Sequence, residues 1–121
     1  MKALVVDDSA VMRKVIIGAL TRADISDVDQ AADGAEAVEA CKNADYGLVL
    51  MDWNMPNMLG IDAVREIRAL GKTMPIIMVT TEAEKGRIVE ALKAGAQNYI
   101  IKPFEPATII DKINQTIEKS Q

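Results

Sequence analysis

The chain has 121 residues and half of them are apolar, which fits one globular domain and excludes a disordered polymer. Its net charge is −4 with both signs interspersed, so it lacks the basic stripe that nucleic-acid binding requires. Histidine is absent and Cys41 is the single cysteine, which excludes histidine-based catalysis, most zinc sites and an internal disulfide. The amino-terminal stretch is neither a signal peptide nor a membrane span, so we expect a cytoplasmic protein.

Short apolar runs alternate with helical patterns along the whole chain. The apolar runs predict strands over residues 3–6, 25–31, 46–51, 75–80 and 98–101. Apolar residues at helical spacing predict helices over residues 10–20, 35–42, 61–70, 83–94 and 106–117. Ser9 and Asp33 are expected N-caps, and Pro106 is expected to open the last helix.

This alternation of strand and helix, repeated five times, predicts a parallel sheet with right-handed crossovers and helices on both faces. We expect the doubly wound α/β fold of flavodoxin-like proteins, with strand order 2-1-3-4-5. One domain is expected to span residues 1–121, with no room for an appended output domain.

Polar side chains stand where four of the five strands end. Asp7 and Asp8 follow the first strand, Asp52 the third, Thr80 ends the fourth, and Lys102 follows the fifth. The second strand, which is an edge strand in this order, offers no such residue. The carboxyl ends of the strands flank the crevice in which open α/β sheets bind ligands. We therefore expect these side chains to share one site.

Three carboxylates in one crevice repel each other unless a cation compensates them, and Mg²⁺ suits oxygen ligands beside a phosphorylated substrate. Lys102 adds a positive charge and Thr80 a hydroxyl, which together favour phosphoryl transfer with Asp52 as the nucleophile. Each residue alone has an ordinary explanation: Asp7 and Asp8 could favour a helix dipole, and the others could be solvated strand ends. Their joint arrangement carries the argument.

With these motifs in place, the chain resembles the receiver domain of bacterial two-component response regulators over its whole length. The resemblance is carried by four segments, which are residues 5–9 (VVDDS), 51–56 (MDWNMP), 78–82 (MVTTE) and 99–104 (YIIKPF). The Asp-Trp-Asn-Met-Pro loop and the expected lack of an output domain are most similar to the stand-alone chemotaxis members. The strand order 2-1-3-4-5 is already known from this family and is no independent result.

The resemblance implies a metal-dependent phosphorylation site. Asp7, Asp8 and Asp52, with the backbone carbonyl of Asn54, would hold Mg²⁺. Asp52 would accept a phosphoryl group from a phosphohistidine on a sensor histidine kinase. Lys102 would contact the phosphate. The protein would catalyse only its own phosphorylation and dephosphorylation, and a helper phosphatase is a further expected kind of partner.

The resemblance also implies a switch. Thr80 would move its hydroxyl onto the phosphate, and Tyr99 would then turn inward. The partner face would comprise the fourth helix, fifth strand and fifth helix, including Lys85, Ile88, Tyr99 and Lys112. A monomer would present this face, most simply to the flagellar motor switch in chemotaxis. Asn54 and Glu82 would govern the access of water, and the Lys102–Pro103 peptide would be cis.

Other functions are open at this stage. The chain could be a phosphorelay intermediate that passes phosphate to another histidine domain, or a phosphorylation-independent binding module. A haloacid-dehalogenase-like phosphatase is disfavoured because Ser9 stands where a second acid is needed. A flavin carrier is disfavoured because Asp7 and Asp8 repel phosphate. Leu59 departs from the family, which usually has Asp there, so the cap of the third helix is either lost or supplied by a residue such as Asn57.

Overall fold

The computed structural model describes residues 1–81 and 86–120. In this part of the chain, strands and helices alternate strictly. The strands are β1 (Lys2–Val6), β2 (Asp27–Ala31), β3 (Leu48–Asp52), β4 (Ile76–Thr81) and β5 (Asn98–Lys102). The helices are α1 (Ala10–Arg22), α2 (Gly34–Asn43), α3 (Gly60–Ala69), α4 (Ile88–Ala94) and α5 (Pro106–Ser120). Each predicted element is therefore present among the described residues.

The strands form one parallel sheet in the order β2-β1-β3-β4-β5, which confirms the predicted fold. β3 lies at the centre and all five of its residues are buried. The strand prediction over 46–51 is shifted, because β3 begins at Leu48 and extends through Asp52. Asp52 pairs with Val79 of β4, so the sheet itself holds its backbone. Asp52 is therefore the last residue of β3 and lies at the carboxyl end of the strand, where the sequence placed it.

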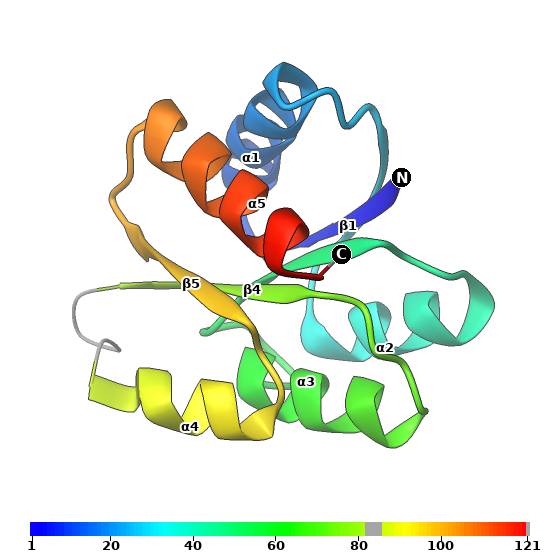
Figure 1. The fold of residues 1–121 in the computed structure, drawn as a ribbon. Coiled ribbons are helices and arrows are strands. Elements are labelled where there is room, and N and C mark those ends of the chain that lie inside the picture. Colours follow the sequence, from blue (N-terminus) through cyan, green and yellow to red (C-terminus); the bar gives the residue numbers. More distant parts are fainter. Residues whose placement is uncertain (82–85, 121) are drawn as a thin grey trace.

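The helices cover both faces of the sheet (Figure 1). α1 and α5 lie together on one face, and α2, α3 and α4 lie on the other. On the first face, Ile16, Leu20, Ile109 and Ile113 are fully buried against the sheet. On the second face, the buried residues include Cys41, which is part of the core. Burial of these apolar faces is the main source of stability.

Two of the predicted N-caps are confirmed. The Ser9 hydroxyl accepts a hydrogen bond from the Met12 amide at 3.2 Å, and the Asp33 carboxylate accepts one from the Glu36 amide at 2.8 Å. α3 follows Leu59 without any side-chain cap, as the change from the family's usual residue suggested. The alternative that Asn57 caps α3 is wrong. Its side-chain amide instead donates to the Asp33 carboxylate at 2.7 Å.

Asn57 also occupies the left-handed backbone region, with a φ of +69°. An alanine at this position would lose the contact with Asp33 and strain the backbone, whereas glycine would lose only the contact. We expect Asn57→Ala to lower the free energy of unfolding by about 1–2 kcal/mol, and Asn57→Gly by about half as much. Urea unfolding of the two variants measures this difference, and equal losses would show that the backbone conformation is unimportant.

The predicted start of the fourth helix lies outside the described residues, as do Glu82 and Lys85. The α-helix runs from Ile88 to Ala94, and the residue that follows it, Gly95, has a φ of +120°. The predicted cis peptide between Lys102 and Pro103 is confirmed. None of the helices in residues 1–81 and 86–120 has the length and apolar character needed to cross a membrane.

Candidate functional site

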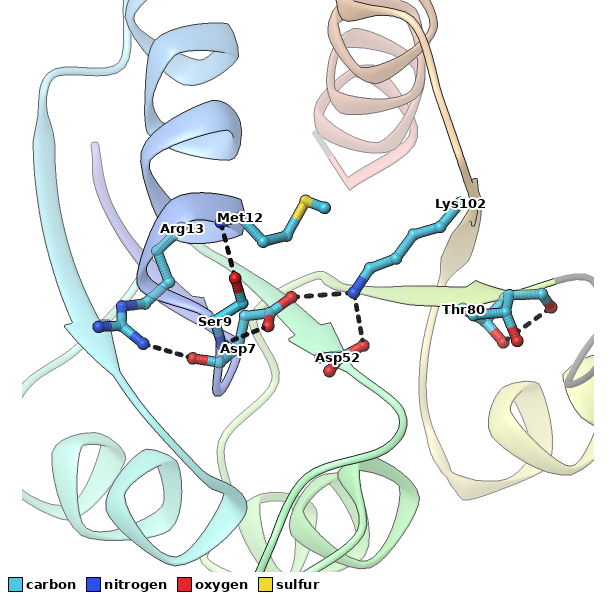
Figure 2. Close-up of polar contacts among 8 residues, drawn as sticks. Asp7, Ser9, Met12, Arg13, Asp52, Thr80 and Lys102 are labelled. Atoms are coloured by element: carbon cyan, nitrogen blue, oxygen red, sulfur yellow. Dashed lines mark hydrogen bonds and ion pairs between the residues drawn. The ribbon is translucent and has the colours of Figure 1, made fainter.

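The ends of β1, β3 and β5 bring two carboxylates and one ammonium group together (Figure 2). Lys102 extends its side chain toward β1 and β3, and its Nζ lies 3.0 Å from Asp7 Oδ2 and 3.1 Å from Asp52 Oδ1. Asp7 and Asp52 are almost completely buried, whereas Lys102 is partly exposed. Residues far apart in the sequence thus meet at one edge of the sheet, as the strand-end pattern predicted.

Asp8 completes an acidic cluster beside this ion pair. One carboxylate oxygen from each of Asp7, Asp8 and Asp52 lies within 4.8 Å of the other two. Asp8 is exposed, so the cluster opens to solvent on its side. Three carboxylates with an open side match the preference of Mg²⁺ for a few protein oxygens and several waters. The donor set of this pocket therefore fits a small divalent cation.

Asp7 is fixed in place from three directions. Its amide donates to the Ala31 carbonyl at 3.1 Å, and its carboxylate accepts a hydrogen bond from the Ser9 amide at 2.9 Å. The guanidinium of Arg13 donates to the Asp7 carbonyl at 2.6 Å (Figure 2). Arg13 escaped prediction because a solvent-facing arginine on a helix carries no signal in the sequence. These contacts leave one oxygen of Asp7 directed at Lys102.

The site has unusual electrostatics because its charges are removed from water. Burial raises the pKa of Asp52 to about 6; Lys102 opposes this shift, whereas Asp7 and Asp8 add to it. Burial also disfavours the charged form of Lys102, but its contacts with Asp7 and Asp52 outweigh that effect and raise its pKa above the usual value. Lys102 is therefore a fixed positive charge, and Asp52 is a carboxylate whose ionisation depends on its neighbours.

Gly60 closes the loop that follows Asp52. Its amide donates to the Trp53 carbonyl at 2.9 Å, and a Cβ at this position would lie 2.0 Å from the backbone oxygen of Asp52. No side chain fits at that distance without moving the end of β3. The close approach of α3 to β3 therefore requires glycine here.

We accordingly expect Gly60→Ala to displace the backbone of Asp52 and to destabilise the domain by about 1–3 kcal/mol, the usual cost of overpacking. Urea unfolding measures the loss. Gly18→Ala is the matched control, because a Cβ at Gly18 meets no atom within 4 Å. Equal stability of the two variants would contradict the requirement for glycine at position 60.

The two residues expected to act as a switch lie on neighbouring strands. Thr80 is buried, and its hydroxyl donates to the Thr81 carbonyl over a long distance of 3.4 Å. Figure 2 shows its side chain pointing away from Asp52. Tyr99 is half-buried, and the ammonium of Lys112 lies 4.6 Å from the centre of its ring. Tyr99, Phe104 and Lys112 line a cavity of about 500 Å³ between β5 and α5.

Three predicted site residues remain, and the structure places two of them. Asn54 is exposed and lies two residues beyond Asp52. Ile88 is half-buried at the start of α4. Lys85 lies outside the described residues, so the structure does not place it.

Comparison with known proteins decides the family. Residues 3–114 match the model of the response regulator receiver domain. The chain belongs to the response regulator receiver domain family. It is 48% identical over 120 residues to a chemotaxis protein CheY homolog of Campylobacter jejuni, covering 97% of this chain and 92% of that protein. It is also 48% identical over 116 residues to chemotaxis protein CheY1 of Helicobacter pylori, covering 93% and 94%.

Solved structures support the assignment of this chain to the receiver domain family. Chemotaxis protein CheY4 of Vibrio cholerae superposes with a TM-score of 0.86 at 34% identity, covering 95% of this chain and 97% of that one. A CheY-like receiver domain protein of Methanospirillum hungatei superposes with a TM-score of 0.88 at 30% identity, covering 98% and 94%. The chain is thus a receiver domain of the CheY type, and members of this family act as signalling switches in two-component systems.

Proposed function

We propose that this receiver domain is a phosphorylation-switched signalling module and that Asp52 is its phosphoacceptor. The observation that carries the proposal is the meeting of the buried Asp52 with Asp7, Asp8 and Lys102 at the carboxyl edge of the sheet. A carboxylate oxygen of Asp52 attacks the phosphorus of a phosphohistidine on a sensor kinase. The phosphorus–nitrogen bond breaks, the imidazole leaves, and an acyl phosphate remains on Asp52.

The surrounding residues assist this transfer by position and charge. Asp7, Asp8, Asp52 and the backbone carbonyl of Asn54 would hold Mg²⁺, which, when bound, neutralises charge on the phosphoryl oxygens. Lys102 is already 3.1 Å from the Asp52 carboxylate and would hydrogen-bond a phosphoryl oxygen attached there. No group has to move far to stabilise the charge that develops, which is the main catalytic contribution in phosphoryl transfer.

The phosphate adds close to two negative charges to a partly dehydrated pocket. The Thr80 hydroxyl, whose contact with the Thr81 carbonyl is long, gains a strong acceptor when it turns toward Asp52. The space vacated by Thr80 would let Tyr99 turn inward, changing the face formed by α4, β5 and α5. Ile88, Tyr99 and Lys112 contribute to that face, with Lys85 as a further member from the sequence.

The output proposed for this face is the flagellar motor switch, because the relatives described above from Campylobacter jejuni and Helicobacter pylori are chemotaxis proteins. We further propose a cytoplasmic, monomeric protein in which residues 1–121 form one receiver domain. A phosphorelay that ends on another histidine domain is the alternative, and it would use the same Asp52 chemistry with a different acceptor.

Affinity capture tests the output. The protein, immobilised with Mg²⁺, is exposed to purified motor-switch protein or to a histidine phosphotransfer domain, with and without beryllofluoride as the phosphate mimic. Retention of the motor-switch protein only with the mimic supports the proposal. Retention that is equal with and without the mimic would indicate a phosphorylation-independent module, and selective retention of the phosphotransfer domain would favour the relay.

A further inference from the structure

Trp53, the residue that follows Asp52, connects the site to two other elements through its backbone. The Trp53 amide donates to the Val79 carbonyl of β4 at 3.1 Å, and its own carbonyl accepts a hydrogen bond from Gly60 at the start of α3. Val79 directly precedes Thr80. Because Asp52 and Trp53 share a peptide bond, any movement of the Asp52 backbone is transmitted to residue 53.

The Trp53 side chain is buried, and no hydrogen bond from the described residues orients it. The residue is only 1% exposed, and its indole nitrogen has no partner among residues 1–81 and 86–120. A buried indole usually finds such a partner. The ring is oriented instead by apolar packing and by the guanidinium of Arg87, whose Cζ lies 4.9 Å from the ring centre. This distance is within the range of an attractive cation–π contact.

Arg87 stands immediately before α4, and the two ends of this helix are held differently. At the far end, the guanidinium of Arg68 on α3 donates twice to the Gly95 carbonyl, at 3.1 and 2.7 Å. At the near end, Arg87 contacts Trp53 and pairs with the exposed Glu90 of its own helix at 3.4 Å. An exposed pair within one helix does not tie that helix to the rest of the domain. The contact between Arg87 and Trp53, in contrast, connects the start of α4 to the loop after β3.

We infer that Arg87 is a positioning residue that couples the start of α4 to the phosphoacceptor loop by stacking on Trp53. The inference rests on the proposed phosphorylation of Asp52 and adds a route from that site to the partner face. Movement of the Asp52–Trp53 backbone shifts the indole relative to the guanidinium. The start of α4 then moves with Arg87, while Arg68 holds the far end of the helix in place.

Trp53 is the only tryptophan in the chain, so its fluorescence reports this contact directly. Arg87→Ala uncovers one face of the indole, and acrylamide is expected to quench the variant about two- to fivefold more efficiently, in proportion to the contact that is lost. Arg87→Lys keeps the charge but lacks the planar guanidinium, so its quenching efficiency should lie between those of the wild-type protein and Arg87→Ala. Arg65→Ala is the matched control, because Arg65 forms the same kind of i,i+3 pair with Asp62 on α3.

The decisive measurement adds Mg²⁺ and beryllofluoride to each protein and records Trp53 fluorescence together with the ¹⁹F NMR signal of bound fluoroberyllate. Coupling predicts that Arg87→Ala binds the mimic but retains less than roughly half of the fluorescence change, whereas Arg65→Ala retains it fully. A full change in Arg87→Ala, or an equal loss in Arg65→Ala, overturns the inference and leaves the proposed function intact. Absence of bound mimic in the wild-type protein overturns the proposed function, and the coupling with it.

Discussion

Replacing Lys102 with methionine is expected to lower the rate of phosphoryl uptake from acetyl phosphate by about 100-fold or more, which is the typical effect of removing one preorganised donor from a buried site. Lys102 is the ammonium between Asp7 and Asp52, and it is positioned before any phosphate arrives. Methionine fills a similar volume but offers neither charge nor hydrogen bond. The rate is measured by intact mass at fixed acetyl phosphate and Mg²⁺ concentrations.

The same substitution separates catalysis from metal binding. Lys102 repels a divalent cation at the acidic cluster, so Lys102→Met should bind Mg²⁺ at least as tightly as the wild-type protein, as followed by Trp53 fluorescence. Lys72→Met serves as the control, because Lys72 also pairs with an aspartate, Asp45, at 2.8 Å but precedes β4 at its opposite end. A Lys102→Met protein with the wild-type rate, or a Lys72→Met protein with the same loss, would contradict the role proposed for Lys102.

Asp52→Asn is expected to stabilise the metal-free protein at neutral pH. The pKa of Asp52 is about 6 in the folded protein, above its ordinary value of 3.8, because burial disfavours the carboxylate. The folded state therefore binds a proton more strongly than the unfolded state, and the stability that protonation contributes is lost as the pH rises from about 4 through 6. Two pKa units correspond to about 3 kcal/mol, and allowance for solvent at the open side gives a range of about 1–3 kcal/mol.

Urea unfolding with EDTA, between pH 4 and pH 7.5, measures this effect. The stability of Asp52→Asn minus that of the wild-type protein should grow up to about pH 6 and then level off. Asp33→Asn is a control of opposite sign, because the Glu36 amide and the Asn57 side chain lower the pKa of Asp33. Its stability relative to the wild type should fall as the pH rises through the acidic range. A constant difference for Asp52→Asn would show that Asp52 does not titrate as described.

The sequence predicted the elements well because the fold depends on patterns that are local. Apolar runs, helical spacing and the caps at Ser9 and Asp33 can each be recognised from a few neighbouring residues. The gathering of acids and lysine at one edge also followed, because the carboxyl ends of parallel strands meet at the same edge. The predicted strand end was one residue short at Asp52, since an aspartate in a fully buried strand is tolerated only where a partner such as Lys102 lies opposite it.

Contacts that depend on two distant segments were not predictable. Arg13 reaches the Asp7 carbonyl, and Asn57 ties the loop before α3 to Asp33, but neither contact is visible in the spacing of residues. The stacking of Arg87 on Trp53 is of the same kind, because it requires α4 to lie against the loop after β3. The sequence marked Trp53 as part of a motif, and only the fold reveals what the indole contacts.

The most direct test of the central proposal is phosphorylation by acetyl phosphate in the presence of Mg²⁺, followed by intact-mass analysis. We expect the wild-type protein to gain one phosphoryl group, EDTA to prevent the gain, and Asp52→Asn to remain unmodified while staying folded. Uptake of phosphate by Asp52→Asn to the wild-type extent would contradict the assignment of Asp52 as the phosphoacceptor.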